Sequence, residues 1–190
     1  MQSTIARLFF ALWPDGAMQA ALAAPVSEIE LGPDSRAVPA KNFHLTLAFL
    51  GAVPRSRFEA LSEVAARFAR AFDPGALPLR LTLDTVEHWS KSQVLCATAS
   101  ETPPATVSLG ESLHVALSSA RFTPDLKTFH PHVTLARNVK RRIRPAPIPS
   151  IVWSFNGFVL VQSQTLPTGS AYEVLESFPL TWTTGQHALL

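Results

Sequence analysis

The sequence predicts an α+β protein with antiparallel sheets, built from two similar lobes. Predicted strands and helices alternate along the 190 residues, but two strand pairs are joined by short turns, as in hairpins, whose strands run antiparallel. The pattern His-x-Thr-Leu-Ala also occurs twice, at residues 44–48 and 132–136. The order strand, helix, His-x-Thr strand recurs loosely around the two copies, which indicates that the two halves of the chain fold alike.

The first half of the chain begins with an apolar run at residues 5–12 that is typical of a buried strand. A Pro-Asp-Gly sequence then favours the start of an alanine-rich helix over residues 14–24, and residues 25–39 are expected to be irregular. The first His-x-Thr strand covers residues 42–51. Apolar residues at helical spacing predict a helix over residues 54–71.

The second half continues with a hairpin, a helix and further strands. In chain order these are strands at 77–86 and 93–99, a helix at 105–120, the second His-x-Thr strand, a basic proline-rich segment at 140–149, and strands at 151–164 and 172–180 joined by a turn at 167–169.

Composition limits the class of protein. Cys96 is the single cysteine, which excludes an intramolecular disulfide and a zinc site made of several thiolates. No apolar stretch approaches the roughly 20 residues that span a bilayer, and the apolar run at residues 8–13 is too short for a signal peptide. A net charge of +2 permits a polyanionic partner without requiring one. We expect one domain over residues 1–190, cytoplasmic and monomeric, that does not contact a membrane.

The two His-x-Thr segments each place an imidazole and a hydroxyl on one side of a strand. Side chains alternate between the faces of a strand, so His44 and Thr46 share one face and the intervening Leu45 lies on the other. His132 and Thr134 follow the same rule. Two such strands facing one site would supply a paired acid and base.

The same segments resemble a known family. Residues 7–14, 43–51, 129–137 and 172–180 are similar, in this order, to the motifs of the 2H phosphoesterases, and most of all to RNA 2′,3′-cyclic phosphodiesterases, also described as 2′-5′ RNA ligases. The resemblance implies a bilobal α+β fold in which two antiparallel sheets flank a central cleft, with helices outside. It also implies metal-independent opening of cyclic phosphates, with no cofactor.

The resemblance further implies roles for the motif residues. His44 is expected to protonate O3′ as the general acid and His132 to activate water as the base, leaving a 2′-phosphate. Thr46 and Thr134 would donate hydrogen bonds to the phosphate oxygens. The expected partners are RNA with 2′,3′-cyclic phosphate ends, tRNA fragments included, or cyclic nucleotides, and 2′-5′ RNA ligation in reverse is a side activity.

Three further residues are candidates for substrate binding, each with a plainer alternative. Arg137 follows the second motif, where the family has an arginine; it is either a phosphate contact or a surface cation. His130 is either a peripheral substrate contact or a surface imidazole. Phe49 either stacks on a base or belongs to the core, as most strand aromatics do.

Two rival functions and one open question remain at this stage. A non-catalytic RNA-binding module on the same fold is one rival, and a metal hydrolase that uses His130 and His132 as ligands is the other, although no His-Glu-x-x-His motif completes such a site. The basic segment 137–144 either contacts RNA phosphates upstream of the cyclic end or is a solvated loop.

Overall fold

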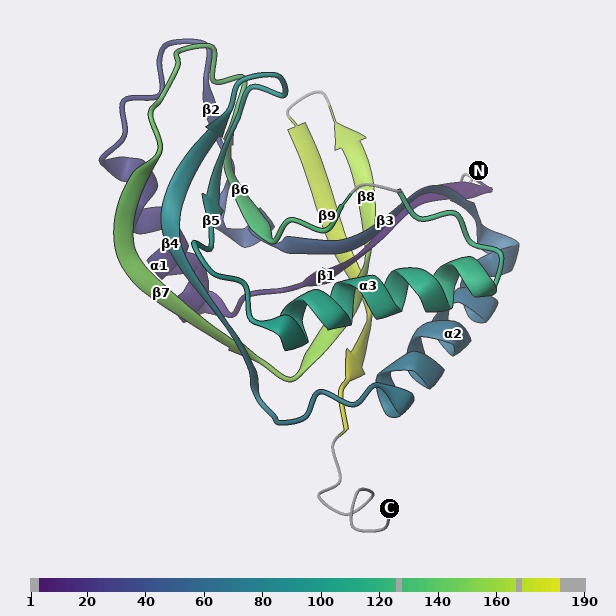
Figure 1. Ribbon diagram of the computed structural model, residues 1–190. Coiled ribbons are helices and arrows are strands. Elements are labelled where there is room, and N and C mark those ends of the chain that lie inside the picture. Colours follow the sequence, from purple (N-terminus) through teal and green to yellow (C-terminus); the bar gives the residue numbers. More distant parts are fainter. Residues whose placement is uncertain (1–3, 126–127, 167–168, 182–190) are drawn as a thin grey trace.

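The computed structural model describes residues 4–125, 128–166 and 169–181 (Figure 1). Within these residues the strands are β1 (Ile5–Leu12), β2 (Arg36–Ala37), β3 (Leu45–Pro54), β4 (Leu79–Trp89), β5 (Val94–Thr98), β6 (His132–Arg137), β7 (Ala146–Phe155), β8 (Gly157–Leu166) and β9 (Gly169–Pro179). The helices are α1 (Gly16–Ser27), α2 (Phe58–Ala71) and α3 (Pro104–Ser119), with short 3₁₀ turns at η1 (Ala40–Asn42) and η2 (Arg55–Arg57).

The strands form one bent sheet in the order β7-β4-β5-β6-β3-β1-β8-β9, with β2 also paired to β6. All of the pairings are antiparallel, which confirms the predicted fold class. The two sheets expected from the resemblance are continuous with each other, because Leu45 of β3 pairs with Val133 of β6. Each His-x-Thr strand therefore lies at the junction between the two halves.

Local sequence explains where the helices begin and which side they bury. The carboxylate of Asp15 accepts a hydrogen bond of 2.8 Å from the backbone N–H of Met18, so α1 starts with a standard N-cap. In α2 the residues at helical spacing, among them Leu61 and Ala65, are buried. α2 and α3 pack side by side outside the sheet, and α1 lies beside β7 (Figure 1). In the described part of the chain, no helix is long and apolar enough to cross a membrane.

The prediction of one strand over residues 151–164 is wrong. The chain breaks at Asn156 into β7 and β8, which lie in different parts of the sheet, since β7 pairs with β4 whereas β8 pairs with β1 and β9. β7 also begins at Ala146, inside the basic proline-rich segment at residues 140–149, for which no strand was predicted. β7 is an edge strand that pairs only with β4 in the described sheet, and prolines are tolerated in such a strand where the backbone N–H would face away from the partner strand. The predicted turn at 167–169 falls mostly on residues outside the described ranges.

Two hydrophobic clusters lie on opposite faces of the sheet near its centre. The main core contains the fully buried Leu45 and Val133, together with residues from all three helices. The second cluster is small and centres on Phe9, Ala11 and Val161 of β1 and β8. It lies beside the first His-x-Thr motif, because Ala11 pairs with Thr46.

Candidate active site

The four motif side chains surround one cross-strand pair. Leu45 and Val133 lie opposite each other and point into the core. One residue further along the antiparallel register, His44 falls opposite Thr134 and Thr46 opposite His132. All four are half-buried and lie on the other side of the sheet, hereafter the histidine face. The predicted alternation of side chains is therefore observed, and each threonine neighbours the histidine of the other motif.

Both imidazoles are oriented by a backbone carbonyl two residues upstream. His44 Nδ1 lies 2.7 Å from the carbonyl oxygen of Asn42, and His132 Nδ1 lies 2.6 Å from that of His130. A carbonyl oxygen only accepts hydrogen bonds, so each ring carries a proton on Nδ1. In the neutral form, Nε2 is then the nitrogen with a free lone pair in both rings. His44 and His132 therefore have the same tautomer, and in each ring Nε2 is the atom that can accept a proton.

A β-bulge follows the threonine in each motif and changes which side chains reach the histidine face. Leu47 is the extra residue where β3 pairs with β1, and Leu135 is the extra residue where β6 pairs with β5. Leucine and the next alanine are consequently both buried in each motif, against strict alternation. The bulges bring Phe49 and Arg137 onto the histidine face, whereas an unbroken period of two would turn them into the core.

Burial is the largest influence on the pKa of both histidines, and it lowers that pKa. It lowers the pKa of His44 from 6.5 to about 4; the hydrogen bond to Asn42 opposes this, and the positive charges of Arg137 and His132 add to it. Burial also lowers the pKa of His132, and the positive charges of His130 and Arg137 act in the same direction. Both rings are therefore neutral at pH 7 in the free protein. An anion bound between them would favour a proton on one ring.

Aromatic rings enclose His44. Its ring centroid lies 4.9 Å from those of Phe9 and Tyr172 and 5.6 Å from that of Trp13, whose plane is within 6° of parallel. Trp13 and Tyr172 were not singled out from the sequence. They come from the two ends of the chain, so no local pattern could have indicated that they meet at this histidine.

His132 has a different neighbourhood. The ring of Trp89 lies 4.4 Å away by centroid, and its indole N–H donates a 3.0 Å hydrogen bond to Glu87. Cys96 lies opposite Thr134, and the two side chains are hydrogen bonded, although burial raises the pKa of the thiol to about 12. The sequence did not indicate Trp89 or Glu87, because their position depends on the register of the β4–β5 hairpin.

The remaining predicted residues lie at the edges of this group. Arg137 is exposed, and its charge acts on both motif histidines. Phe49 is half-buried and packs onto the small cluster around Phe9, with the Arg7 guanidinium 5.5 Å from its ring centroid. The ring of His130 is exposed, and its carbonyl group is what contacts His132.

Two further features bear on what the site can bind. Among the described residues, no three His, Cys, Asp or Glu side chains are grouped so as to hold a metal ion. A pocket of about 1060 Å³ lies between the start of α1 and the corner where β7 meets β8. Trp13 lines it, but neither motif histidine does.

Comparison with known proteins extends the resemblance seen in the sequence. The family model described as the 2′-5′ RNA ligase superfamily matches residues 18–165. The chain is 32% identical over 148 residues to an RNA 2′,3′-cyclic phosphodiesterase of Escherichia coli K12, covering 77% of this chain and 80% of that protein. It is 31% identical over 185 residues to one of Thermus thermophilus, covering 92% and 90% respectively.

Solved structures agree with these sequence matches. The crystal structure of E. coli LigT complexed with 3′-AMP superposes with a TM-score of 0.81 at 27% identity, covering 94% of this chain and 99% of that one. Both His-x-Thr motifs lie within the residues that the family model matches. With that match across most of its length, the chain belongs to the 2′-5′ RNA ligase superfamily.

Proposed function

We propose that this protein hydrolyses the 2′,3′-cyclic phosphate end of RNA to a 2′-phosphate, without a metal ion, by means of His44 and His132. The observation that carries the proposal is the arrangement around Leu45 and Val133. It puts two imidazoles on one face with Nδ1 of each held by a carbonyl, so that both Nε2 atoms are free for proton transfer. The relatives named RNA 2′,3′-cyclic phosphodiesterase support the same activity.

The reaction needs one base and one acid on opposite sides of the phosphorus. Nε2 of the base takes a proton from water, and the water oxygen bonds to phosphorus as the bond to O3′ breaks. Nε2 of the acid gives its proton to O3′. The product carries a 2′-phosphate and a 3′-hydroxyl, and solvent returns the two rings to their starting protonation states.

The threonines and Arg137 stabilise negative charge on the phosphate. Hydroxyl groups of Thr46 and Thr134 are next to the imidazole of the opposite motif, so they can donate to the two non-bridging oxygens. Arg137 adds positive charge near both rings. We assign Phe49 to contact with the terminal nucleoside and His130 to the periphery of the substrate.

The assignment of acid and base follows the family resemblance, with His44 as the acid. The surroundings of His44 oppose this role in the free protein, because burial among three rings keeps its pKa low. The acid role therefore requires the bound phosphate to raise that pKa. An RNA 5′-hydroxyl that attacks in place of water would form a 2′-5′ linkage, which accounts for ligation as a side activity. We further propose a monomeric, cytoplasmic enzyme of one domain over residues 1–190.

Turnover by matched variants tests the function. His44→Gln and His132→Gln remove the titrating group but keep a side chain of similar polarity, so each should reduce kcat on an adenosine 2′,3′-cyclic phosphate by about 10²–10⁴. His114→Gln, in α3 and outside both motifs, is the control and should be unchanged. The product is identified by ³¹P NMR as the 2′-phosphate, with EDTA present throughout.

Each alternative has its own result in this assay. A non-catalytic RNA-binding module would bind the nucleotide without turning it over. A metal hydrolase would lose activity in EDTA and recover it with zinc or manganese. A 3′-phosphate product would overturn the assignment of O3′ as the leaving group.

A further inference from the structure

The two strands of the β8–β9 hairpin extend beyond the strand that supports them. β1 pairs with β8 only over residues 159–163, so residues 164–166 and 169–171, hereafter the hairpin end, pair only with each other in the described sheet. An isolated pair of strands is marginally stable in water. The hairpin end therefore needs a contact outside the hairpin if it is to keep one position.

Asn42 supplies such a contact. Its side-chain amide donates a hydrogen bond of 3.1 Å to the carbonyl oxygen of Ser170 in the hairpin end. Asn42 lies just before β3, and β9 is three strands away from β3 in the sheet order, which would be about 14 Å in a flat sheet. In Figure 1 the hairpin runs across the direction of β1 and β3, so the twist of this half of the sheet brings the hairpin end to the start of β3.

Asn42 also contacts His44, by two routes. The first is direct, because the backbone carbonyl oxygen of Asn42 lies 2.7 Å from His44 Nδ1. The second passes through the hairpin, since Tyr172 follows Ser170 by two residues and therefore lies on the same side of β9. The ring centroid of Tyr172 is 4.9 Å from that of His44, with an angle of 70° between the rings. The hydrogen bond to Ser170 thus fixes the strand that carries a neighbour of the motif histidine.

We propose that Asn42 is a positioning residue that holds the hairpin end, and with it the ring of Tyr172, against His44. The proposal rests on the function proposed above and adds a residue outside both His-x-Thr motifs. A hydrogen bond at Nδ1 fixes one atom of the imidazole but lets the ring pivot about that atom. Van der Waals contact with Tyr172 limits this movement. Nε2 then keeps the direction that proton transfer to the substrate requires.

The first test separates kcat from KM. Asn42→Ala removes the bond to Ser170 but keeps the backbone carbonyl group that accepts from His44. It should lower kcat on adenosine 2′,3′-cyclic phosphate about three- to tenfold, which corresponds to the net contribution of one hydrogen bond. KM should change less than about twofold, because a misdirected imidazole affects the transition state and not the binding of the nucleotide. A loss confined to KM would overturn the proposal.

A double-variant comparison shows whether Asn42 acts through Tyr172. Tyr172→Ala removes the ring that the hairpin end presents to His44, so it should also lower kcat. If the two residues act as one unit, Asn42→Ala should lower kcat no further in the Tyr172→Ala protein. Losses that multiply would mean that Asn42 acts independently of the hairpin, against the proposal.

A readout by NMR needs no activity. The Cε1–H resonance of His44, assigned by its absence in His44→Gln, senses the neighbouring aromatic rings. Asn42→Ala and Tyr172→Ala should shift this resonance in the same direction, and combining them should add nothing to the shift of Tyr172→Ala. An unmoved resonance in Asn42→Ala would contradict the placement of Tyr172 by Asn42.

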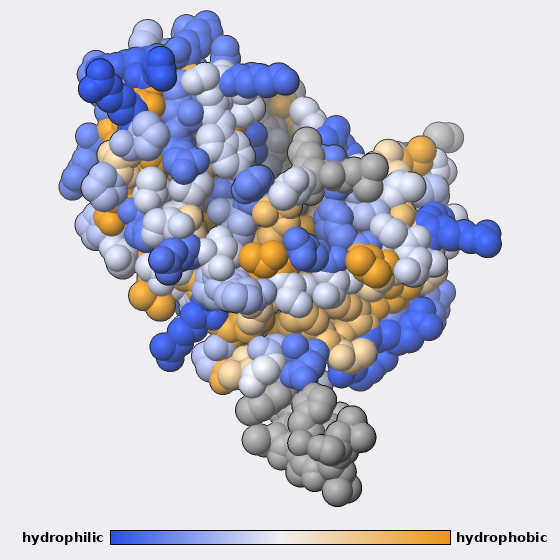
Figure 2. Space-filling model, viewed as in Figure 1, coloured by the Kyte–Doolittle hydropathy of each residue, from blue (hydrophilic) through white to orange (hydrophobic). Residues whose placement is uncertain are grey.

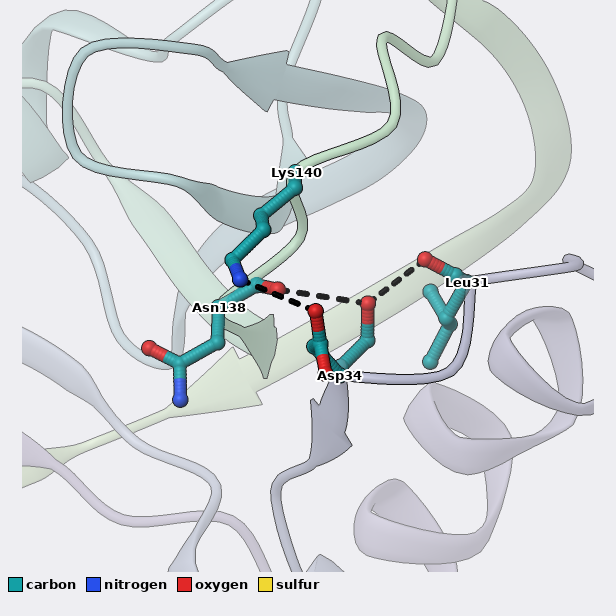
Figure 3. Close-up of polar contacts among 5 residues, drawn as sticks. Leu31, Asp34, Asn138 and Lys140 are labelled. Atoms are coloured by element: carbon teal, nitrogen blue, oxygen red, sulfur yellow. Dashed lines mark hydrogen bonds and ion pairs between the residues drawn. The ribbon is translucent and has the colours of Figure 1, made fainter.

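Ser35→Ala is the matched control. The Ser35 hydroxyl donates to the carbonyl groups of Leu31 and Asn138, next to the ion pair of Lys140 with Asp34 (Figure 3). The substitution therefore also removes a bond from a side chain to a distant carbonyl group, but in the half of the molecule that contains the second motif. It should leave the His44 resonance in place. A shift as large as that of Asn42→Ala would show that the resonance does not report on the hairpin end.

The proposed function and this positioning role can fail separately. If the wild-type protein does not turn over the cyclic nucleotide, the proposed function is wrong, and the His44 resonance alone then decides whether Asn42 places Tyr172. If the wild-type protein is active but Asn42→Ala leaves both kcat and the resonance unchanged, the function stands and the positioning role is overturned.

Discussion

At His44, burial and a hydrogen bond act on the imidazole in opposite directions, and burial is the larger effect. The pKa falls from 6.5 to about 4, so the folded protein holds this ring neutral where the unfolded chain would protonate it. A lowered pKa means that the stabilising contribution is complete above pH 6.5 and is lost as the pH falls toward 4. The full shift corresponds to about 3 kcal/mol at most.

We expect His44→Gln to remove this part of the pH dependence. Glutamine does not titrate, so between pH 7 and pH 4.5 the free energy of unfolding of the variant should fall less than that of the wild-type protein, by about 1–3 kcal/mol. Urea unfolding at the two pH values measures the difference. Since carboxylates contribute equally to both proteins, parallel pH curves would show that the folded state does not suppress protonation of His44.

In each His-x-Thr-Leu-Ala strand, the leucine and the alanine decide which of the following side chains reach the histidine face, because the bulge lies there. Alternation along the sequence correctly predicted that His44, Thr46, His132 and Thr134 would face away from the core. It could not predict the bulges at Leu47 and Leu135, because a bulge is defined by the neighbouring strand. Arg137 was therefore named as a candidate by family resemblance, and Phe49 because aromatic rings can stack on bases, in both cases without a local reason for the direction of the side chain.

The corner between β7 and β8 depends on a missing side chain. A Cβ at Gly157 would lie 2.7 Å from the carbonyl oxygen of Phe178, so Gly157→Ala forces backbone atoms apart. We expect a loss of about 1–3 kcal/mol in unfolding free energy. Gly16→Ala, at a glycine with nothing within 4 Å, should be neutral or stabilising by up to about 1 kcal/mol. Equal stability of the two variants in thermal melts would contradict the crowding at Gly157.

Across the whole molecule, the two halves share the motif but differ in what surrounds it. Beside the first motif, the buried Phe9 and Ala11 of β1 lie beneath the partly buried aromatic rings of Trp13, Phe49 and Tyr172. Beside the second, Thr98 lies opposite His132, and Arg137 is close by. The first motif is therefore surrounded mainly by aromatic rings, and the second has polar and basic neighbours. Sequence patterns predicted the repeat, but this difference arises from strand neighbours distant in the chain, which one sequence does not reveal.

One cluster of charged side chains lies at the end of the molecule near β2. Figure 2 shows a group of strongly hydrophilic residues over the end where, in Figure 1, the loop before β2 meets the segment after β6, and further hydrophilic residues elsewhere on this face. Lys140 and Arg141 pair there with Asp34 and Glu30. Among the residues described, the exposed Arg142 and Arg144 have no such partner.

We expect the ion pairs of Lys140 and Arg141 to reduce the share of these two residues in the salt dependence of RNA binding. Each phosphate contact on a single strand contributes about 0.7 to the slope of log affinity against log salt. Replacing Arg142 and Arg144 together with Ser should flatten the slope by up to about 1.4, whereas replacing Lys140 and Arg141 together should change it less. Fluorescence anisotropy with a labelled RNA oligomer at several salt concentrations measures both. Identical slopes in the two double variants would mean that the ion pairs do not decide which cations meet RNA.

The sheet consists of two halves that are joined along one short seam, the pairing of β3 with β6. Neighbouring strands within each half share ladders along most of their length, but β3 and β6 meet at the single pair of Leu45 and Val133, with the two residues of β2 as a strap beside it. Few backbone hydrogen bonds therefore fix the separation of the two imidazoles, which lie on either side of the seam, and the side chains of the main core, which come from both halves, hold the seam together.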